Sequence, residues 1–262
     1  EGTIRKNLID HNNIDAIIGL PANIFFGTGI PTIIMVLRKN KKDSDVLIID
    51  ASKGFEKDGK NNKLRACDIK RIVDAYKERP EKIEKFARRV SRAEIIQNDY
   101  NLNIPRYVDS SEKAESWDIY ASMFGGIPEA ELQDLSAYWT AFPHLKVALF
   151  SPDNEAYCHL NVQNLKNAVL SHPDVVAFKT AFQNAFGDFD AYLKSALIDG
   201  MTALNAASEE ERLSREIFAR LAEIPLIDRY AAYQLLDDDW KKIAIDLEII
   251  QTEGFAAAKQ VD

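Results

Sequence analysis

The sequence has few of the residues that mark secreted, membrane or metal-binding proteins. It has only two cysteines in 262 residues, Cys67 and Cys158, and they lie far apart. This pattern indicates reduced thiols in a cytoplasmic protein rather than a disulfide framework. No run approaches the roughly 18 apolar residues of a membrane span, and no signal peptide is present. The four histidines are His11, His144, His159 and His172. They are not spaced from the cysteines as the ligands of a metal site are, so we expect no metal site.

An excess of positive charge is lacking as well, since the net charge is −8. The charge is unevenly distributed: residues 1–110 contain 21 Lys and Arg against 16 Asp and Glu, whereas residues 111–262 contain 12 against 25. The two parts therefore have net charges of +5 and −13. Such asymmetry suggests a different partner for each part. Ordinary solvation of helix faces is the alternative for the acidic part.

The most informative stretch lies near the beginning of the chain. Two apolar runs, Ile14–Leu20 and Thr32–Leu37, have strand length and are rich in β-branched residues, so both are predicted strands. Because both are almost wholly apolar, we expect both faces of their sheet to be covered. The link carries Phe25 and Phe26 beside Gly27, which favours a hairpin at the edge of the sheet with a glycine-rich loop.

Other elements of the first part follow from periodicity and turn residues. We predict a helix over residues 2–12, an edge strand over Val46–Asp50 and a loop over Ala51–Asn62. Further helices are predicted over Asp68–Lys77, from Pro80 to Phe86, and after the Ser91–Glu94 capping box. Asn98–Tyr107 reads as irregular, with an extended Ile104-Pro105.

The polar stretch Ser110–Ser116 is the best domain boundary, and we expect only helices beyond it. Helix starts are indicated at Pro128, Pro143, Pro173, Ser208 and Asp237, with the helix from Pro173 running to Leu197 and the last helix to Gln251. The three tryptophans lie on helical patterns of apolar residues and are predicted to be core residues: Trp117, Trp139 and Trp240.

Several short motifs occur in a fixed order over about the first 110 residues: Leu20-Pro21, Ile24–Ile30, the strand Thr32–Arg38, Asp50-Ala51-Ser52, Gly54–Lys57, Asn61-Asn62 and Asn98–Tyr107. Together they resemble the end of the catalytic domain of the modification (M) subunit of type I restriction–modification systems. The segment after residue 116 resembles, with less specific motifs, the helical extension of longer M subunits. We therefore read the chain as an excised part of a larger protein.

The resemblance implies a fold that is α/β followed by all-α. Residues 1–110 would be the tail end of a Rossmann-like methyltransferase sheet, and residues 111–262 a helical extension that docks other subunits. It implies a site-specific DNA methyltransferase that transfers a methyl group from S-adenosylmethionine to the exocyclic amine of adenine. The implied partners are DNA, a specificity subunit, a restriction subunit and a second M subunit.

Two motifs of that chemistry are missing. The sequence has no Asn-Pro-Pro-aromatic tetrapeptide and no G-x-G-x-x-G turn, and its Gly27-Thr28-Gly29 cluster precedes a strand rather than a helix. We expect no catalytic and no cofactor-binding residues here, S-adenosylmethionine being bound upstream. The isolated chain should be inactive.

By position, Phe25 is the candidate to stack on an extruded adenine, with Phe26 second; the alternative is that both pack in the core of the hairpin. A basic cluster consists of Lys53, Lys57, Lys60, Lys63 and Arg65. These residues are candidates for contact with DNA phosphates, or a solvated loop. The same two readings apply to Arg88, Arg89 and Arg92.

Two other functions remain compatible with the sequence. One is a non-catalytic helical protein-interaction module attached to a basic DNA-contacting platform. The other is a DNA-binding protein unrelated to methylation, which would bind duplexes in a salt-sensitive way without any upstream domain.

Overall fold

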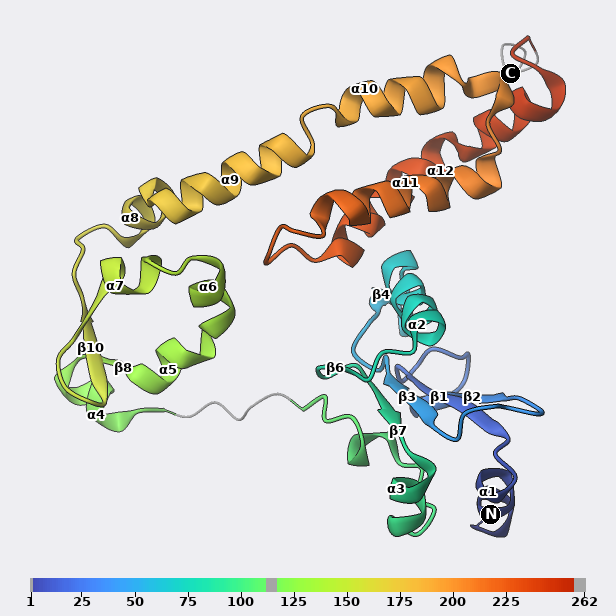
Figure 1. Cartoon of the computed structure of the whole chain (residues 1–262), viewed down its shortest axis with the longest axis horizontal. Coiled ribbons are helices and arrows are strands. Elements are labelled where there is room, and N and C mark those ends of the chain that lie inside the picture. Colours follow the sequence, from blue (N-terminus) through green and yellow to red (C-terminus); the bar gives the residue numbers. More distant parts are fainter. Residues whose placement is uncertain (1, 112–116, 257–262) are drawn as a thin grey trace. The chain divides into compact units, whose positions relative to one another are not determined.

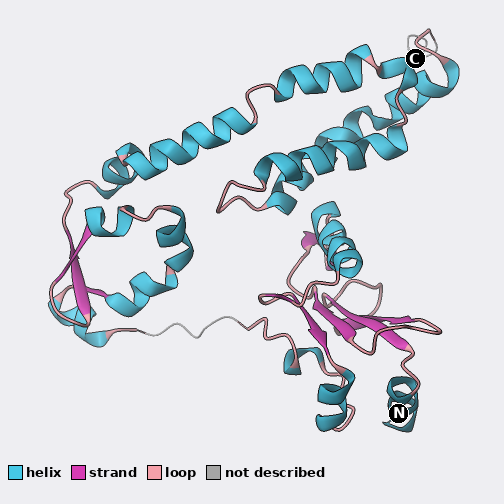
Figure 2. Ribbon diagram, in the orientation of Figure 1, coloured by secondary structure: helices cyan, strands magenta, loops and turns pink. Residues whose placement is uncertain are grey.

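A computed structural model describes residues 2–111 and 117–256 of the chain (Figure 1). The chain divides into two compact units, residues 1–114 and 115–262. Figure 2 shows that strands occur in both units, whereas the second unit consists mainly of helices.

The first unit is built on a five-stranded sheet with the order β2-β1-β3-β7-β6. Its strands are β1 (Ile14–Leu20), β2 (Thr32–Leu37), β3 (Val46–Asp50), β6 (Lys82–Ile83) and β7 (Ala87–Val90). β1 and β3 are parallel, and the other neighbours are antiparallel. A separate hairpin pairs β4 (Glu56–Asp58) with β5 (Asn61–Lys63). The helices are α1 (Gly2–Asp10), α2 (Ala66–Glu78), α3 (Arg92–Gln97) and the 3₁₀ turn η1 (Ile104–Arg106).

The central strands divide their side chains between two cores. Ile17 and Ile48 point to one core, which contains Ile95 of α3, while Ile18 and Ile49 point to the other, which contains Ile72 of α2. This is the period of two that a strand imposes. Every residue of β1 and β3 is therefore buried, as expected for a sheet covered on both faces.

The hairpin of β1 and β2 is confirmed with the predicted bounds, and β2 lies at the sheet edge. Its covering was predicted wrongly: Ile33 is 55% exposed and Leu37 is 56% exposed. β3 is a central strand rather than an edge, because β7 pairs with its second side.

The predicted helix from Pro80 to Phe86 is wrong. This stretch contains β6, and pairing with β3 makes β7 a strand that buries Ala87 and Val90. Tertiary pairing here overrides the local pattern. The predicted loop 51–62 contains β4 and the start of β5, and Ile104-Pro105 is a 3₁₀ turn rather than extended. The α3 cap is confirmed, since Ser91 Oγ accepts a hydrogen bond from Glu94 N at 3.2 Å.

The second unit is not helical throughout. It contains a three-stranded antiparallel sheet of β8 (Ile127–Pro128), β9 (Phe150–Pro152) and β10 (Tyr157–Leu160), with β10 in the centre. Its shorter helices are α4 (Ile119–Phe124), α5 (Glu129–Asp134), α6 (Ser136–Ala141), α7 (Leu145–Leu149) and α8 (Leu165–Ser171). The two β9–β10 residues Ser151 and His159 face each other across the ladder.

The remaining helices extend to residue 253. They are α9 (Pro173–Ala185), α10 (Phe189–Leu193), the π-helix η2 (Lys194–Asp199), the 3₁₀ turn η3 (Met201–Ala203), α11 (Ala206–Leu221) and α12 (Arg229–Glu253). The predicted long helix from Pro173 is interrupted after Ala185, and the last helix starts earlier than Asp237.

Trp240 is buried and Trp139 packs against a core cluster, but Trp117 is 82% exposed, so its predicted core position is wrong. Across the described ranges, none of the helices has the length and apolar composition needed to cross a membrane.

Candidate functional site

The parallel strands β1 and β3 end at the same edge of the first sheet, where Gly19 lies opposite Asp50. Ligands of α/β proteins bind outside the carboxyl ends of such strands. Two connections leave this edge: the loop of residues 21–31 after β1, and the segment after β3 that leads into the β4–β5 hairpin. Phe25 and Phe26 lie on the first connection and the cluster from Lys53 to Arg65 lies on the second, whereas Arg88, Arg89 and Arg92 lie elsewhere, on β7 and α3.

The loop of residues 21–31 presents aromatic side chains to solvent. Phe25 is 54% exposed and Phe26 is 98% exposed, so the alternative that both pack in the core of the hairpin is wrong. Thr28 N donates to the Phe25 carbonyl at 3.2 Å. Gly27 between them has φ +77°, a conformation that favours glycine. This turn contains the two exposed rings.

The segment of residues 53–63, which contains the β4–β5 hairpin, presents the predicted lysines. Lys53, Lys57, Lys60 and Lys63 are all exposed, and the Lys57 ammonium lies 5.4 Å from the centre of the Phe55 ring. A row of ammonium groups in water can contact phosphates without first breaking strong internal bonds.

Arg65 differs from the lysines because its guanidinium is already bound. Its Nε donates to Asp68 Oδ2 at 2.9 Å and its Nη2 donates to Asp68 Oδ1 at 3.0 Å. Bidentate pairs of this kind are among the stronger ion pairs. The second basic cluster is bound in the same way: Arg88 pairs with Glu94, Arg89 with Glu81, and Arg92 with Asp10. These pairs favour a structural role for the four arginines.

Asn62 joins the lysine hairpin to the aromatic loop. Its backbone N–H donates to the Asn23 carbonyl at 2.9 Å, and its side-chain Nδ2 donates to the Ala22 carbonyl at 2.7 Å. The residue is only 6% exposed. Among the described atoms its buried Oδ1 has no hydrogen-bond partner. The sequence pattern placed Asn62 in a motif but did not indicate this link.

Behind the loop, Asp50 closes the carboxyl edge of the sheet. It is 7% exposed and accepts hydrogen bonds from Ser52 N at 3.0 Å and from Ser110 Oγ at 2.5 Å. Beside it lies an open cavity of about 730 Å³, lined by β1, β2 and the segment 101–105. A Cβ at Gly19 would come within 2.7 Å of Ile104 Cδ1, so a larger residue there would require the Ile104 side chain to shift.

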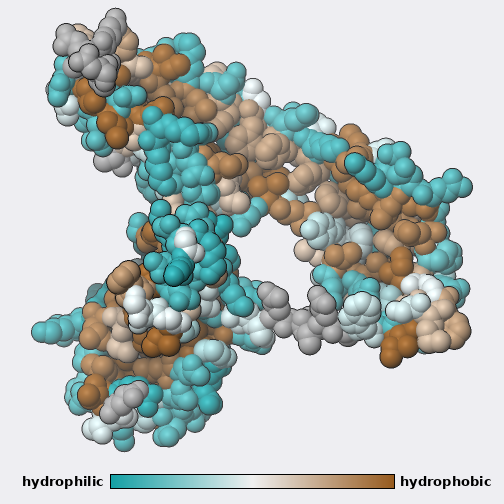
Figure 3. Space-filling view, turned by 180° about the vertical axis from the view of Figure 1, so that it is seen from behind, coloured by the Kyte–Doolittle hydropathy of each residue, from teal (hydrophilic) through white to brown (hydrophobic). Residues whose placement is uncertain are grey.

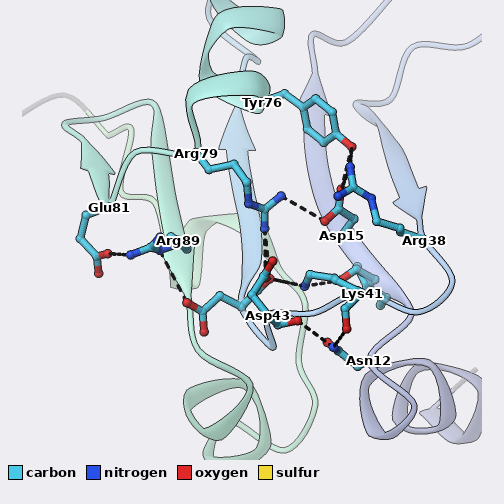
Figure 4. Close-up of polar contacts among 11 residues, drawn as sticks. Asn12, Asp15, Arg38, Lys41, Asp43, Tyr76, Arg79, Glu81 and Arg89 are labelled. Carbon is cyan, nitrogen blue, oxygen red and sulfur yellow. Dashed lines mark hydrogen bonds and ion pairs between the residues drawn. The ribbon is translucent and has the colours of Figure 1, made fainter.

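The opposite end of β1 carries a polar network that is structural (Figure 4). Asp15 is fully buried and accepts from Tyr76 Oη at 2.6 Å and from Arg79 Nη1 at 3.1 Å. Its Oδ2 also lies 3.2 Å from Arg38 Nη2. The hydrogen bond to Asp15 raises the pKa of Tyr76. Lys41 donates to the Ile14 carbonyl at 3.2 Å, and burial lowers its pKa.

The described residues do not fit a methyl-donor site. Neither parallel strand runs through a glycine-rich turn into a helix. β1 leads into the aromatic loop, and the helix after β3 begins only at Ala66, with Asp68 in its first turn. Within the described ranges, no cluster of three or more His, Cys, Asp or Glu could hold a metal ion.

Comparison with known proteins shows what the first unit is similar to. The family profile described as N-6 DNA Methylase matches residues 1–116. Residues 1–116 are therefore similar to the N-6 DNA methylase family.

The chain is similar to the type I restriction enzyme MpnII methylase subunit of Mycoplasma pneumoniae, with 42% identity over 120 residues. That alignment covers 45% of this chain and 22% of the relative. The HindI methylase subunit of Haemophilus influenzae is 33% identical over 145 residues, covering 52% of this chain and 31% of the relative.

A solved structure, the type I restriction-modification system methyltransferase subunit from Streptococcus thermophilus, is 54% identical. The match covers 42% of this chain and 23% of that chain, with a TM-score of 0.41. This chain therefore spans less than a third of the length of the relatives it matches.

Proposed function

We propose that this chain is part of the methylase subunit of a type I restriction–modification enzyme, a site-specific adenine DNA methyltransferase. The first unit is the final part of its Rossmann-like catalytic domain and supplies DNA contacts. The observation that carries this proposal is the joining of two exposed phenylalanines and a lysine hairpin at one edge of the sheet, in a unit that is similar to the N-6 DNA methylase family.

In this proposal Phe25 stacks on the target adenine after it leaves the duplex, with Phe26 as the second candidate. Base extrusion costs a few kcal/mol, and stacking one base on an aromatic ring contributes ~1–3 kcal/mol. The ring therefore offsets much of the extrusion cost. Because Phe25 is 54% exposed, it is accessible to a base without unfolding the loop.

The lysines of the hairpin contact phosphates and fix the position of the duplex. Phosphate contacts carry no sequence information, so recognition of the target sequence falls to a separate specificity subunit. The link through Asn62 keeps the backbone-contacting hairpin and the base-stacking loop in a constant relation.

S-adenosylmethionine supplies the methyl group in this proposal. The described residues lack the turn that would hold it, so donor binding and the polar residues that contact the adenine amine are assigned to the remainder of the subunit. The isolated chain then has no methylation activity, and calorimetry should detect no specific micromolar site for the donor. The proposed location of the protein is the cytoplasm.

Residues 117–262 are proposed to dock protein subunits rather than DNA. The net charge of −13 in residues 111–262 opposes a polyanion at long range. The partners would be the specificity subunit, the restriction subunit and a second methylase subunit. Deleting residues 117–262 should weaken capture of the specificity subunit, and undiminished capture would refute the docking role.

The base-stacking role is tested with Phe25→Ala in the full-length subunit. We expect a loss of ~1–3 kcal/mol in flipped-base stabilisation, seen as reduced methylation and reduced fluorescence of 2-aminopurine at the target position. Donor binding should not change. If Phe26→Ala is defective and Phe25→Ala is normal, the role belongs to Phe26. Two normal variants would refute the proposal.

A further inference from the structure

The second unit contains an apolar groove between its long helices. The groove has a volume of about 710 Å³ and lies between α9–α10 on one side and α12 on the other, with α11 contributing residues as well. Figure 3 shows hydrophobic surface along the helices of this unit. A compact monomer normally buries such a surface, so an apolar groove of this size marks a binding site.

The length of the groove corresponds to about four turns of an α-helix. Its wall on α12 and the preceding turn runs from Asp228 to Ile243, which at 1.5 Å per residue is about 24 Å, or roughly four turns. Helical walls with apolar ridges accept another helix by ridges-into-grooves packing. The side chains that line the groove include Leu235, which is 70% exposed, and Ile243, which is 38% exposed. Such half-open anchors suit the apolar stripe of an incoming helix.

The charges around the groove identify the kind of helix. The groove lining among the described residues includes two carboxylates, Asp228 and Asp239, and no lysine or arginine. Asp239 pairs with Lys242 on the surface, where both side chains are more than 70% exposed, and such pairs are weak. The surrounding part of the chain has a net charge of −13. A second copy of this unit would bring the same negative charge to the groove and be repelled there.

We propose that the groove binds an amphipathic helix of a partner protein, with an apolar stripe flanked by lysine or arginine. This inference deepens the proposed docking function and rests on it. The apolar stripe would pack against α12 and α9–α10, while the basic flanks face Asp228 and Asp239. Like-charged partners are excluded by the same field that attracts the basic helix.

The test uses the 262-residue chain and a synthetic 16-residue peptide with leucines at helical spacing and lysines at all other positions. Calorimetric titration should show binding that weakens as NaCl is raised, and a peptide with glutamate in place of lysine should not bind. Leu235→Lys should weaken binding about ten-fold. Ile245→Lys is the matched control, because Ile245 is 69% exposed on the same helix but lies outside the groove lining.

Other outcomes overturn the proposal. Equal binding by Leu235→Lys and Ile245→Lys, or tight binding of the glutamate peptide, would refute the groove or its charge preference. A chain that dimerises in sedimentation experiments and loses dimerisation in Leu235→Lys would assign the groove to a second copy instead. Because Leu235 is exposed, its substitution should leave the urea unfolding midpoint unchanged. If the peptide does not bind, the docking function itself is still tested separately by capture of the specificity subunit.

Discussion

The link between the lysine hairpin and the aromatic loop makes a sharp prediction at Asn62. Asn62→Ala removes the hydrogen bond from Nδ2 to the Ala22 carbonyl but keeps the backbone bond to the Asn23 carbonyl. A hydrogen bond contributes about 1 kcal/mol net, and a buried carbonyl left without a partner costs about 1–3 kcal/mol. The substitution also removes the unpaired Oδ1, which offsets part of this cost. We expect the first unit to lose about 1–2 kcal/mol of stability.

Hydrogen exchange measured by mass spectrometry reports this change directly. Since 1.4 kcal/mol corresponds to about a factor of ten, residues 21–31 should exchange about ten-fold faster in Asn62→Ala. Asn61→Ala is the matched control, because Asn61 is an exposed neighbour on the same hairpin and a surface change there stays within about 0.5 kcal/mol. In the full-length subunit, Asn62→Ala should reduce 2-aminopurine fluorescence while Phe25 is intact. If Asn62→Ala and Asn61→Ala behave alike in both assays, the proposed coupling is wrong.

Three further predictions concern charge, stability and the thiol. In the full-length subunit, the negative slope of log binding constant against log salt should become shallower by about 0.9 in each of Lys57→Ala, Lys60→Ala and Lys63→Ala. Arg65→Ala should change the slope little, because Asp68 binds its guanidinium; titrations between about 50 and 200 mM NaCl distinguish these cases. Asp15→Ala should cost about 3–5 kcal/mol in urea unfolding, since it leaves Arg79 without its buried partner, and the exposed Asp58→Ala should cost almost nothing. Burial raises the pKa of the Cys158 thiol, with a further contribution from Glu129. Alkylation of Cys158 in the folded protein should therefore be slow at pH 8 and accelerate only as the pH rises past the ordinary thiol range. Rapid labelling of Cys158 at pH 8 would contradict this.

Local signals predicted the part of the fold that local interactions determine. The β1–β2 hairpin was predicted with its observed bounds because two β-branched runs enclose a glycine-rich loop. The Ser91 cap was predicted because its hydrogen bond spans only three residues. In contrast, the four-residue strand β7 owes its conformation to β3, about 40 residues away. The central position of β3 follows from the same pairing. Neither feature could therefore be predicted from the hydrophobic periodicity of the sequence.

The same distinction applies to the candidate site. Residue types indicated Phe25, Phe26 and the lysines, and the structure brings their two connections together at the carboxyl edge of one sheet. The role of Asn62 depends on a contact 40 residues away in the sequence. The binding of Arg65 by Asp68 is a local contact at spacing i to i+3. Both residues are visible in the sequence, but a prediction from the density of positive charge does not include the pairing of Arg65 with Asp68.

The free edge of β2 leads to a prediction about the chain in isolation. β2 pairs with β1 on one side only, and Ile33, Ile34 and Leu37 are 55%, 47% and 56% exposed. The strand contains no charged residue and no proline, which are the features that natural edge strands use against pairing with other chains.

We therefore expect the isolated chain to self-associate as its concentration rises, through β2 pairing with the β2 strand of another molecule. Ile34→Lys places a charge on the exposed strand and should shift sedimentation toward monomer, whereas Ile4→Lys, on the 66%-exposed Ile4 of α1, should not. Addition of the remaining methylase sequence should abolish the association if it covers this edge. The contrary result is a wild-type chain that stays monomeric at about 100 times the concentration used for binding assays. A hundred-fold higher concentration favours association by about 2.7 kcal/mol of free energy, so this result would show that the β2 edge is protected within the chain itself.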